Sequence, residues 1–227
     1  MSLFKANTFL EPNIEKPKIP AVLAENFFLF FTVSSESIII IGALDFPIKL
    51  DIILDKTFVD QLASHLRNKV RWQPNNSASR SYPYNENLEY VLLGHKFFNR
   101  LSLDIIEYGE DMEFNKKLIN LFYHLKDAFN KPNIMLEQIA GNLQFKGMDG
   151  GLHMDGYKED NKTSFILMLS PDYDVENDGG VFYNETKDKE IAFKHGRVVE
   201  IESSDLHLGK AFDSPYKMRF SLRFTGG

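Results

Sequence analysis

Residues 150–157 read GGLHMDGY, and this short stretch places His153 and Asp155 two positions apart. In an extended chain, residues i and i+2 point to the same side, so one imidazole and one carboxylate can converge on a single metal ion. The pair alone is weak evidence, because a chain with six histidines and 32 acidic residues contains such pairs by chance. A surface turn explains it equally well.

A second histidine, His207, follows a β-like run and a Ser-Ser-Asp loop in the segment 196–209, GRVVEIESSDLHLG. The chain between the two histidines is long enough for a few strands, so His207 can return beside His153 and Asp155. Two histidines and one carboxylate on one side of an ion leave the opposite positions open. This arrangement is typical of non-haem Fe(II) oxygenases.

The last β-like run, residues 216–224, reads YKMRFSLRF and alternates cleanly between apolar and polar positions. The alternation predicts an apolar face and a polar face. The apolar face holds Tyr216, Met218, Phe220, Leu222 and Phe224, and the polar face holds Arg219, Ser221 and Arg223. An arginine among apolar positions usually has an anionic partner, and a guanidinium can bind a carboxylate through two hydrogen bonds, with Ser221 adding another. An exposed edge strand is the alternative interpretation.

The rest of the chain predicts two helices followed by an all-β region. Apolar spacing favours helices over 58–70, with Thr57 and Asp60 as a capping box, and over 115–129, which Pro132 ends. Short β-like runs separated by Gly-, Asp- and Asn-rich loops follow at 134–145, 164–169, 180–184, 190–194, 197–202 and 216–224. Such a series is typical of a sandwich or barrel, here mainly β with supporting helices.

Two further stretches need an interpretation. Residues 27–44 approach the length of a membrane span, but the polar cluster around Glu36 favours two short strands and a turn, within several strands over 27–54. Residues 71–100 form a long aromatic and polar connection, interpreted either as a lid that touches the substrate or as an irregular surface excursion. Its candidate contact residues are Trp72, Arg80, Tyr82 and Tyr84.

The composition excludes several classes of function. The net charge of −6 argues against a nucleic-acid partner, and the absence of cysteine excludes disulfides and thiolate metal sites. The N-terminus shows no basic segment followed by an apolar run, as a signal peptide would. We therefore expect a soluble, intracellular (cytoplasmic) protein without a membrane segment.

The order of these motifs resembles the 2-oxoglutarate- and Fe(II)-dependent dioxygenase superfamily, most closely its prolyl-hydroxylase-type branch. The resemblance rests on His-x-Asp, the Gly179–Gly180 strand, Gly-Arg-Val-Val, a lone histidine and Arg-x-Ser, and it covers roughly residues 50–225. It implies a double-stranded β-helix (jelly-roll or cupin-like) core over 51–227. Residues 1–50 then form an N-terminal extension whose strands pack on the core.

The resemblance also implies the chemistry. His153, Asp155 and His207 would bind Fe(II), and Arg219, assisted by Ser221, would hold the distal carboxylate of 2-oxoglutarate, with Arg223 as the alternative arginine. The reaction would consume 2-oxoglutarate and O2, with ascorbate as an optional addition, and hydroxylate a prolyl residue of a peptide or a small molecule. A cupin-like metalloenzyme that does not use 2-oxoglutarate and a non-catalytic binding module on the same fold are the alternatives.

Overall fold

The computed structural model describes residues 29–33, 36–41, 51–74, 92–103, 105–174 and 176–227. The elements of the first half are β1 Leu29–Val33, β2 Glu36–Ile41, β3 Asp51–Leu54, α1 Lys56–Asn68, β4 Leu93–Arg100, β5 Ile106–Tyr108 and α2 Met112–Ala128. Those of the second half are β6 Leu136–Gln144, β7 Thr163–Leu169, β8 Phe182–Asn184, β9 Lys189–Ile191, β10 Arg197–Glu202, β11 His207–Gly209 and β12 Arg219–Gly226.

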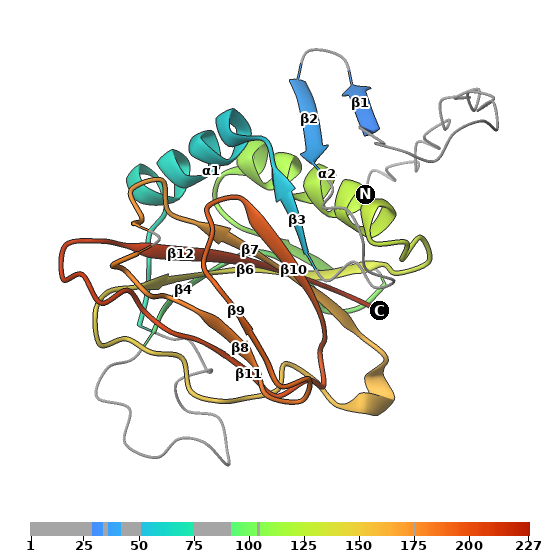
Figure 1. The fold of residues 1–227 in the computed structure, drawn as a ribbon. Coiled ribbons are helices and arrows are strands. Elements are labelled where there is room, and N and C mark those ends of the chain that lie inside the picture. The colour runs from blue at the N-terminus through green and yellow to red at the C-terminus, as the bar shows by residue number, and fades with distance from the viewer. Residues whose placement is uncertain (1–28, 34–35, 42–50, 75–91, 104, 175) are drawn as a thin grey trace, which may run out of the picture.

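The strands form two antiparallel sheets that face each other. The large sheet has the order β1-β2-β3-β10-β7-β12-β6-β4-β5, and the small sheet has the order β11-β8-β9 (Figure 1). Consecutive strands of the second half alternate between the sheets in places, as in β7 to β8 and β10 to β11. The result is the predicted mainly β double-stranded β-helix with supporting helices.

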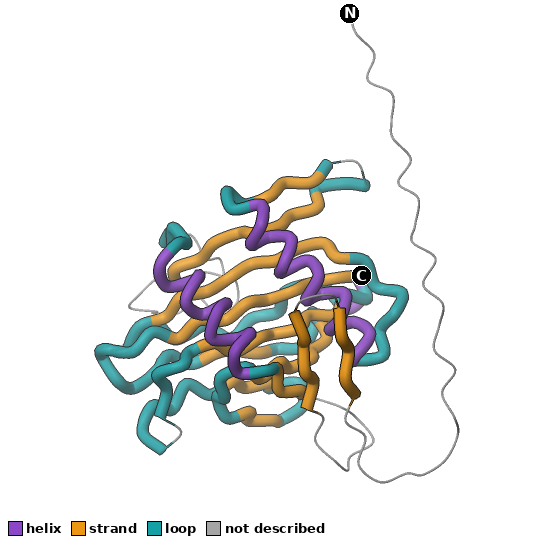
Figure 2. The backbone as a smooth tube through the Cα atoms, turned by 90° about the horizontal axis from the view of Figure 1, so that it is seen from above, coloured by secondary structure: helices purple, strands orange, loops and turns teal. Residues whose placement is uncertain are grey.

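Both helices lie across one face of the large sheet, which Figure 2 shows from above. Their apolar faces pack onto the sheet to form the main core. Each helix begins earlier than its apolar pattern suggests, because the side chains of Asp55 and Asp111 accept hydrogen bonds from the third residue of each helix. The predicted capping box at Thr57 was therefore wrong, since Thr57 already lies inside α1.

The alternation of β12 separates the two sides of the large sheet. Phe220, Leu222 and Phe224 are fully buried in the core under the helices. The neighbouring residues Arg219, Ser221 and Arg223 face the space between the two sheets. Tyr216, predicted on the apolar face, is 93% exposed because the strand begins only at Arg219.

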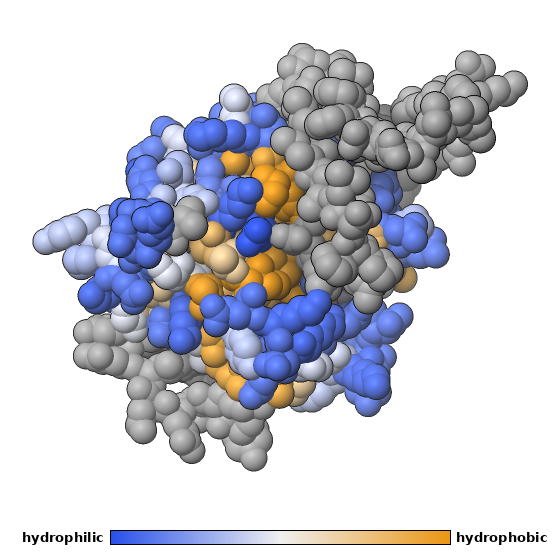
Figure 3. Space-filling view, viewed as in Figure 1, coloured by the Kyte–Doolittle hydropathy of each residue, from blue (hydrophilic) through white to orange (hydrophobic). Residues whose placement is uncertain are grey.

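A second, smaller core fills the space between the sheets. Phe182 and Phe193 meet Val199, Ile201 and Phe212 there. In the view of Figure 3, apolar residues show between the hydrophilic residues of the helix layer above and of the small-sheet layer below. This second core holds the small sheet against the large one, and a cavity remains between the sheets near β11 and β12.

The connection predicted over 71–100 was partly wrong. Residues 93–100 form β4, which pairs with β6 in the large sheet. Trp72 packs on Phe220, with ring centroids 5.8 Å apart, and its indole N–H donates to the Leu66 carbonyl at 3.0 Å. It is therefore part of the core rather than a lid residue. Arg80, Tyr82 and Tyr84 lie outside the described residues, as does the expected domain boundary at residue 50.

The apolar stretch 27–44 contains the antiparallel pair β1 and β2, as its pattern predicts. Strand β2 pairs in turn with β3, so this hairpin continues the large sheet. No helix in the described part of the chain combines the length and the apolar character that crossing a bilayer requires.

Candidate metal centre

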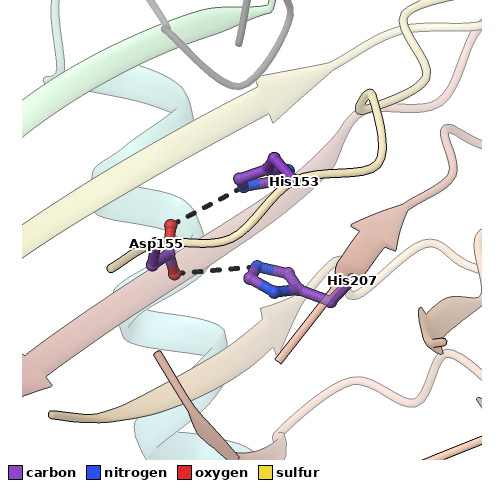
Figure 4. A group of neighbouring side chains, drawn as sticks. All are labelled: His153, Asp155 and His207. Carbon is purple, nitrogen blue, oxygen red and sulfur yellow. Dashed lines mark ion pairs between the residues drawn. The ribbon is translucent and has the colours of Figure 1, made fainter. Parts of the chain in front are cut away.

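His153, Asp155 and His207 come together where the segment after β6 runs beside the start of β11 (Figure 4). The backbones of His153 and His207 exchange two hydrogen bonds, of 3.0 and 2.9 Å. The Asp155 N–H donates to the Ser203 carbonyl at 2.8 Å. These bonds hold the His-x-Asp segment in an extended form, so both of its side chains point toward His207.

The three side chains present their ligand atoms to one point. Nε2 of His153 and Nε2 of His207 each lie 3.6 Å from an oxygen of Asp155. The Nδ1 atoms face backbone carbonyls, that of Gly151 at 2.7 Å and that of Asp205 at 2.8 Å. A carbonyl can only accept, so each Nδ1 carries the proton and each Nε2 keeps a free lone pair. This tautomer is the one that metal binding requires.

The protonation states also suit a metal. Burial alone would raise the pKa of the Asp155 carboxyl, but the Arg223 guanidinium opposes burial, and this pKa lies well below its ordinary value. Burial lowers the pKa of His207, so its imidazole is neutral at pH 7. An ionised carboxylate and neutral imidazoles are the forms that bind a divalent ion. The Asp155 Oδ2 atom is buried without a hydrogen-bond partner among the described residues, and a cation there would satisfy it.

A buried cluster that the sequence did not reveal positions His207. Asp205, whose carbonyl accepts from the imidazole, is itself 4% exposed. Its carboxylate accepts hydrogen bonds from Asn184 at 2.9 Å and from Lys187 at 2.8 Å. Because these bonds span β8 and the loop before β11, they fix the direction of the His207 ring.

His153, Asp155 and His207 line a cavity of about 390 Å³ between the two sheets. Arg219 is buried in the wall of this cavity. Its guanidinium donates to Gln144 Oε1 at 2.5 Å and to the Gly180 carbonyl at 3.3 Å, and it lies 5.5 Å from the Phe193 ring centroid. Burial lowers the pKa of Arg219 to about 10, so the side chain stays charged at neutral pH. Its Nη2 is buried without a hydrogen-bond partner among the described residues. An anion in the cavity would satisfy that donor.

The other arginine of β12 is already engaged. Arg223 donates from Nη1 to Asp155 Oδ1 and from Nη2 to Gln138 Oε1. Ser221 lies between the two arginines on the cavity wall. Of the two arginines, only Arg219 has a terminal nitrogen, Nη2, without a partner among the described residues; both terminal nitrogens of Arg223 are bonded, and its Nε is the atom left without one.

The remaining described histidines lie apart from this cluster. His195 accepts from the Ser170 N–H through Nδ1 and bonds Asp60 through Nε2, both at 2.9 Å, and so joins α1 to the end of β7. His65 stacks on Phe114 with ring centroids 3.7 Å apart. His95 lines the same cavity, without belonging to the triad, and bonds the Arg71 carbonyl.

The fold and the His-Asp-His triad together define a class: a double-stranded β-helix protein with two histidines and one aspartate in the cavity between its two sheets. No family model matches the sequence, and no curated protein matches it. Solved structures do match, and among them are a 2OG-Fe(II) oxygenase family protein, prolyl hydroxylases and a non-haem α-ketoglutarate-dependent epimerase.

Three of these structures illustrate the likeness. A 2OG-Fe(II) oxygenase family oxidoreductase from Burkholderia pseudomallei is 15% identical, with 76% of this chain and 79% of that chain covered and a TM-score of 0.53. A Pseudomonas putida prolyl-4-hydroxylase is 16% identical, with 77% of this chain and 88% of that chain covered and a TM-score of 0.53. A Trichoplax adhaerens prolyl hydroxylase was solved in complex with a hypoxia-inducible-factor peptide fragment. It is 16% identical, with 75% of this chain and 76% of that chain covered and a TM-score of 0.51. The chain thus has the fold of these oxygenases.

Proposed function

We propose that the protein is a non-haem Fe(II) dioxygenase that couples the oxidative decarboxylation of 2-oxoglutarate to the hydroxylation of a substrate. The observation that carries this proposal is the pairing of two sites in one cavity: two imidazoles and a carboxylate with free ligand atoms, and a buried arginine with a free donor. A metal site alone would also suit a cupin-like enzyme. The buried cation beside it favours a co-substrate with a distal carboxylate.

Each residue has a defined role in this proposal. His153, Asp155 and His207 would hold the iron, which supplies the redox chemistry when it is bound. Arg219 would bind the distal carboxylate of 2-oxoglutarate, with Ser221 as an additional donor. The hydrogen bonds to Gly151 and Asp205 keep the imidazoles in the ligand tautomer.

For the substrate, we propose a prolyl residue of a peptide or a small molecule of similar size. The fold likeness to prolyl hydroxylases, one of them solved with a peptide fragment, supports the first. The cavity, at about 390 Å³, lies within the usual range of small-molecule sites, which supports the second. Succinate formation in the presence of proline-containing peptides, compared with free amino acids, separates the two.

The first test is an anaerobic titration of the Fe(II)-loaded protein with 2-oxoglutarate, followed by the weak visible charge-transfer band of the chelate. We expect a saturable band that is absent in Asp155→Ala and unchanged in Asp172→Ala, a surface aspartate paired with Arg67. Bound iron without a band would instead favour a cupin-like enzyme or a binding module.

A further inference from the structure

A row of three side chains crosses the cavity wall from β12 to β4, and both ends of this row are cationic. Ala140 of β6 lies directly opposite Arg223 of β12 on one side and opposite Lys96 of β4 on the other. The strands β12, β6 and β4 are consecutive in the large sheet (Figure 1). Residues that lie opposite each other in a sheet share a face, and all three line the cavity. Because neighbouring strands are about 4.8 Å apart, the two cations extend from backbones about 10 Å apart, with only a methyl group between them.

Within the described part of the chain, no acidic side chain neutralises Lys96. This lysine is exposed, and its ammonium group forms no ion pair or hydrogen bond with another described residue. Glu107 lines a neighbouring surface hollow together with Lys96, but its carboxylate accepts from the Asn99 amide at 3.0 Å. Gly94, two residues before Lys96 on the same strand, also lines the cavity and has no side chain to fill it. This part of the cavity therefore combines open space with an unpaired positive charge.

The charges around the cavity do not cancel once the proposed metal and co-substrate are bound. Asp155 provides the only carboxylate among the described residues that line the cavity, whereas Lys96, Arg219 and Arg223 each bring a positive charge. The charges of Fe(II) and Arg219 are balanced by those of Asp155 and the two carboxylates of 2-oxoglutarate. The charges of Lys96 and Arg223 are left over. A partly enclosed positive charge is costly without an anionic partner, so this part of the cavity favours a negatively charged ligand.

We propose that the substrate carries a carboxylate that binds over Ala140, between Lys96 and Arg223. The inference rests on the proposed function, in which Arg219 holds the other carboxylate in the cavity, that of 2-oxoglutarate. Arg219 and Arg223 are four residues apart along β12, so their backbones lie about 13 Å apart and the two carboxylates have separate partners. The substrate is then a small free acid rather than an internal residue of a peptide, because a peptide backbone presents only neutral amides there.

The test is a calorimetric titration in two steps, first of the Mn(II)-loaded protein with 2-oxoglutarate and then of the saturated complex with acid and amide probes. N-Acetyl-L-proline and N-acetyl-L-prolinamide have nearly the same shape and differ in charge, as do hippurate and hippuramide. We expect at least one acid to bind about tenfold more tightly than its amide, as charged hydrogen bonds typically allow. In Lys96→Met this preference should fall to roughly threefold, because the exposed ammonium contributes the smaller part, and Lys96→Arg should restore it. The amide is the internal reference, since a merely structural defect would weaken the binding of both probes.

Lys116→Met is the matched control, because it removes the same charge from an exposed position on α2, on the other face of the large sheet (Figure 2). It should keep the full preference for the acid. Equal binding of acids and amides, binding of none of the four probes at millimolar concentration, or an unchanged preference in Lys96→Met would overturn the inference and leave the proposed function standing. If 2-oxoglutarate does not bind in the first step, the proposed function itself fails and the inference fails with it.

Discussion

Replacing Arg219 with methionine tests how the cavity holds a dicarboxylate. Arg219 is 2% exposed, and its free Nη2 is the donor that a carboxylate would occupy. Removing one partner of a buried, hydrogen-bonded charge pair costs about 2–5 kcal/mol. Since about 1.4 kcal/mol corresponds to a tenfold change, the affinity for 2-oxoglutarate should fall by roughly thirtyfold to four thousandfold.

The variant should still fold. Gln144, 2% exposed, loses its bond from Arg219, which costs about 1–3 kcal/mol for a buried acceptor. The protein no longer buries a charge with an unsatisfied donor, which offsets much of this loss. We therefore expect the free energy of unfolding to change by less than about 2 kcal/mol, within the usual range for single substitutions.

The assay is calorimetric titration of the Mn(II)-loaded protein with two ligands. 2-Oxopentanoate has the same keto-acid group as 2-oxoglutarate but lacks the distal carboxylate. Arg219→Met should weaken the binding of 2-oxoglutarate by the factor given above and leave the affinity for 2-oxopentanoate almost unchanged. Arg100→Met, a substitution in the same sheet outside the cavity, should change neither affinity. An equal loss for both ligands, or 2-oxoglutarate affinity within threefold of the wild type, would refute the role of Arg219.

Three further predictions concern the surroundings of the site. A Cβ at Gly209 would lie 3.1 Å from Arg219 Nη2, so Gly209→Ala should push the guanidinium out of place at a cost of about 1–2 kcal/mol. We therefore expect 2-oxoglutarate binding to weaken by roughly tenfold in the same titration. Burial lowers the pKa of His195, against the opposing effect of Asp60, so below about pH 6.5 the unfolded chain gains a proton that the native state excludes. Stability should therefore fall between pH 7.5 and 5.5, and urea unfolding should show a smaller fall in His195→Gln; an equal fall would contradict this reasoning. Phe165 is fully buried and stacked on Phe129, so Phe165→Ala should lower the free energy of unfolding by about 3–5 kcal/mol. Tyr216 is 93% exposed, so Tyr216→Ala should change the free energy of unfolding by less than about 0.5 kcal/mol in the same urea experiment.

Much of the fold could be read from the sequence because the relevant signals are local. The β-like runs after residue 133 each overlap a strand of the structure, and both predicted helices are present with their starts shifted by a few residues. The shifts come from Asp55 and Asp111, whose capping bonds extend each helix beyond its apolar pattern. Strand β4 was missed because it follows the aromatic connection directly and is held in the sheet by pairing with the distant strand β6.

By itself, the sequence determined the features that depend on a period of two residues. These are the common side of His153 and Asp155 and the separation of Arg219, Ser221 and Arg223 from the apolar face of β12. Only the tertiary structure decided which arginine has a free terminal nitrogen. Arg223 meets Asp155, 68 residues away, and Arg219 meets Gln144, 75 residues away. Such partners depend on the order of strands in the sheet, which local spacing does not encode.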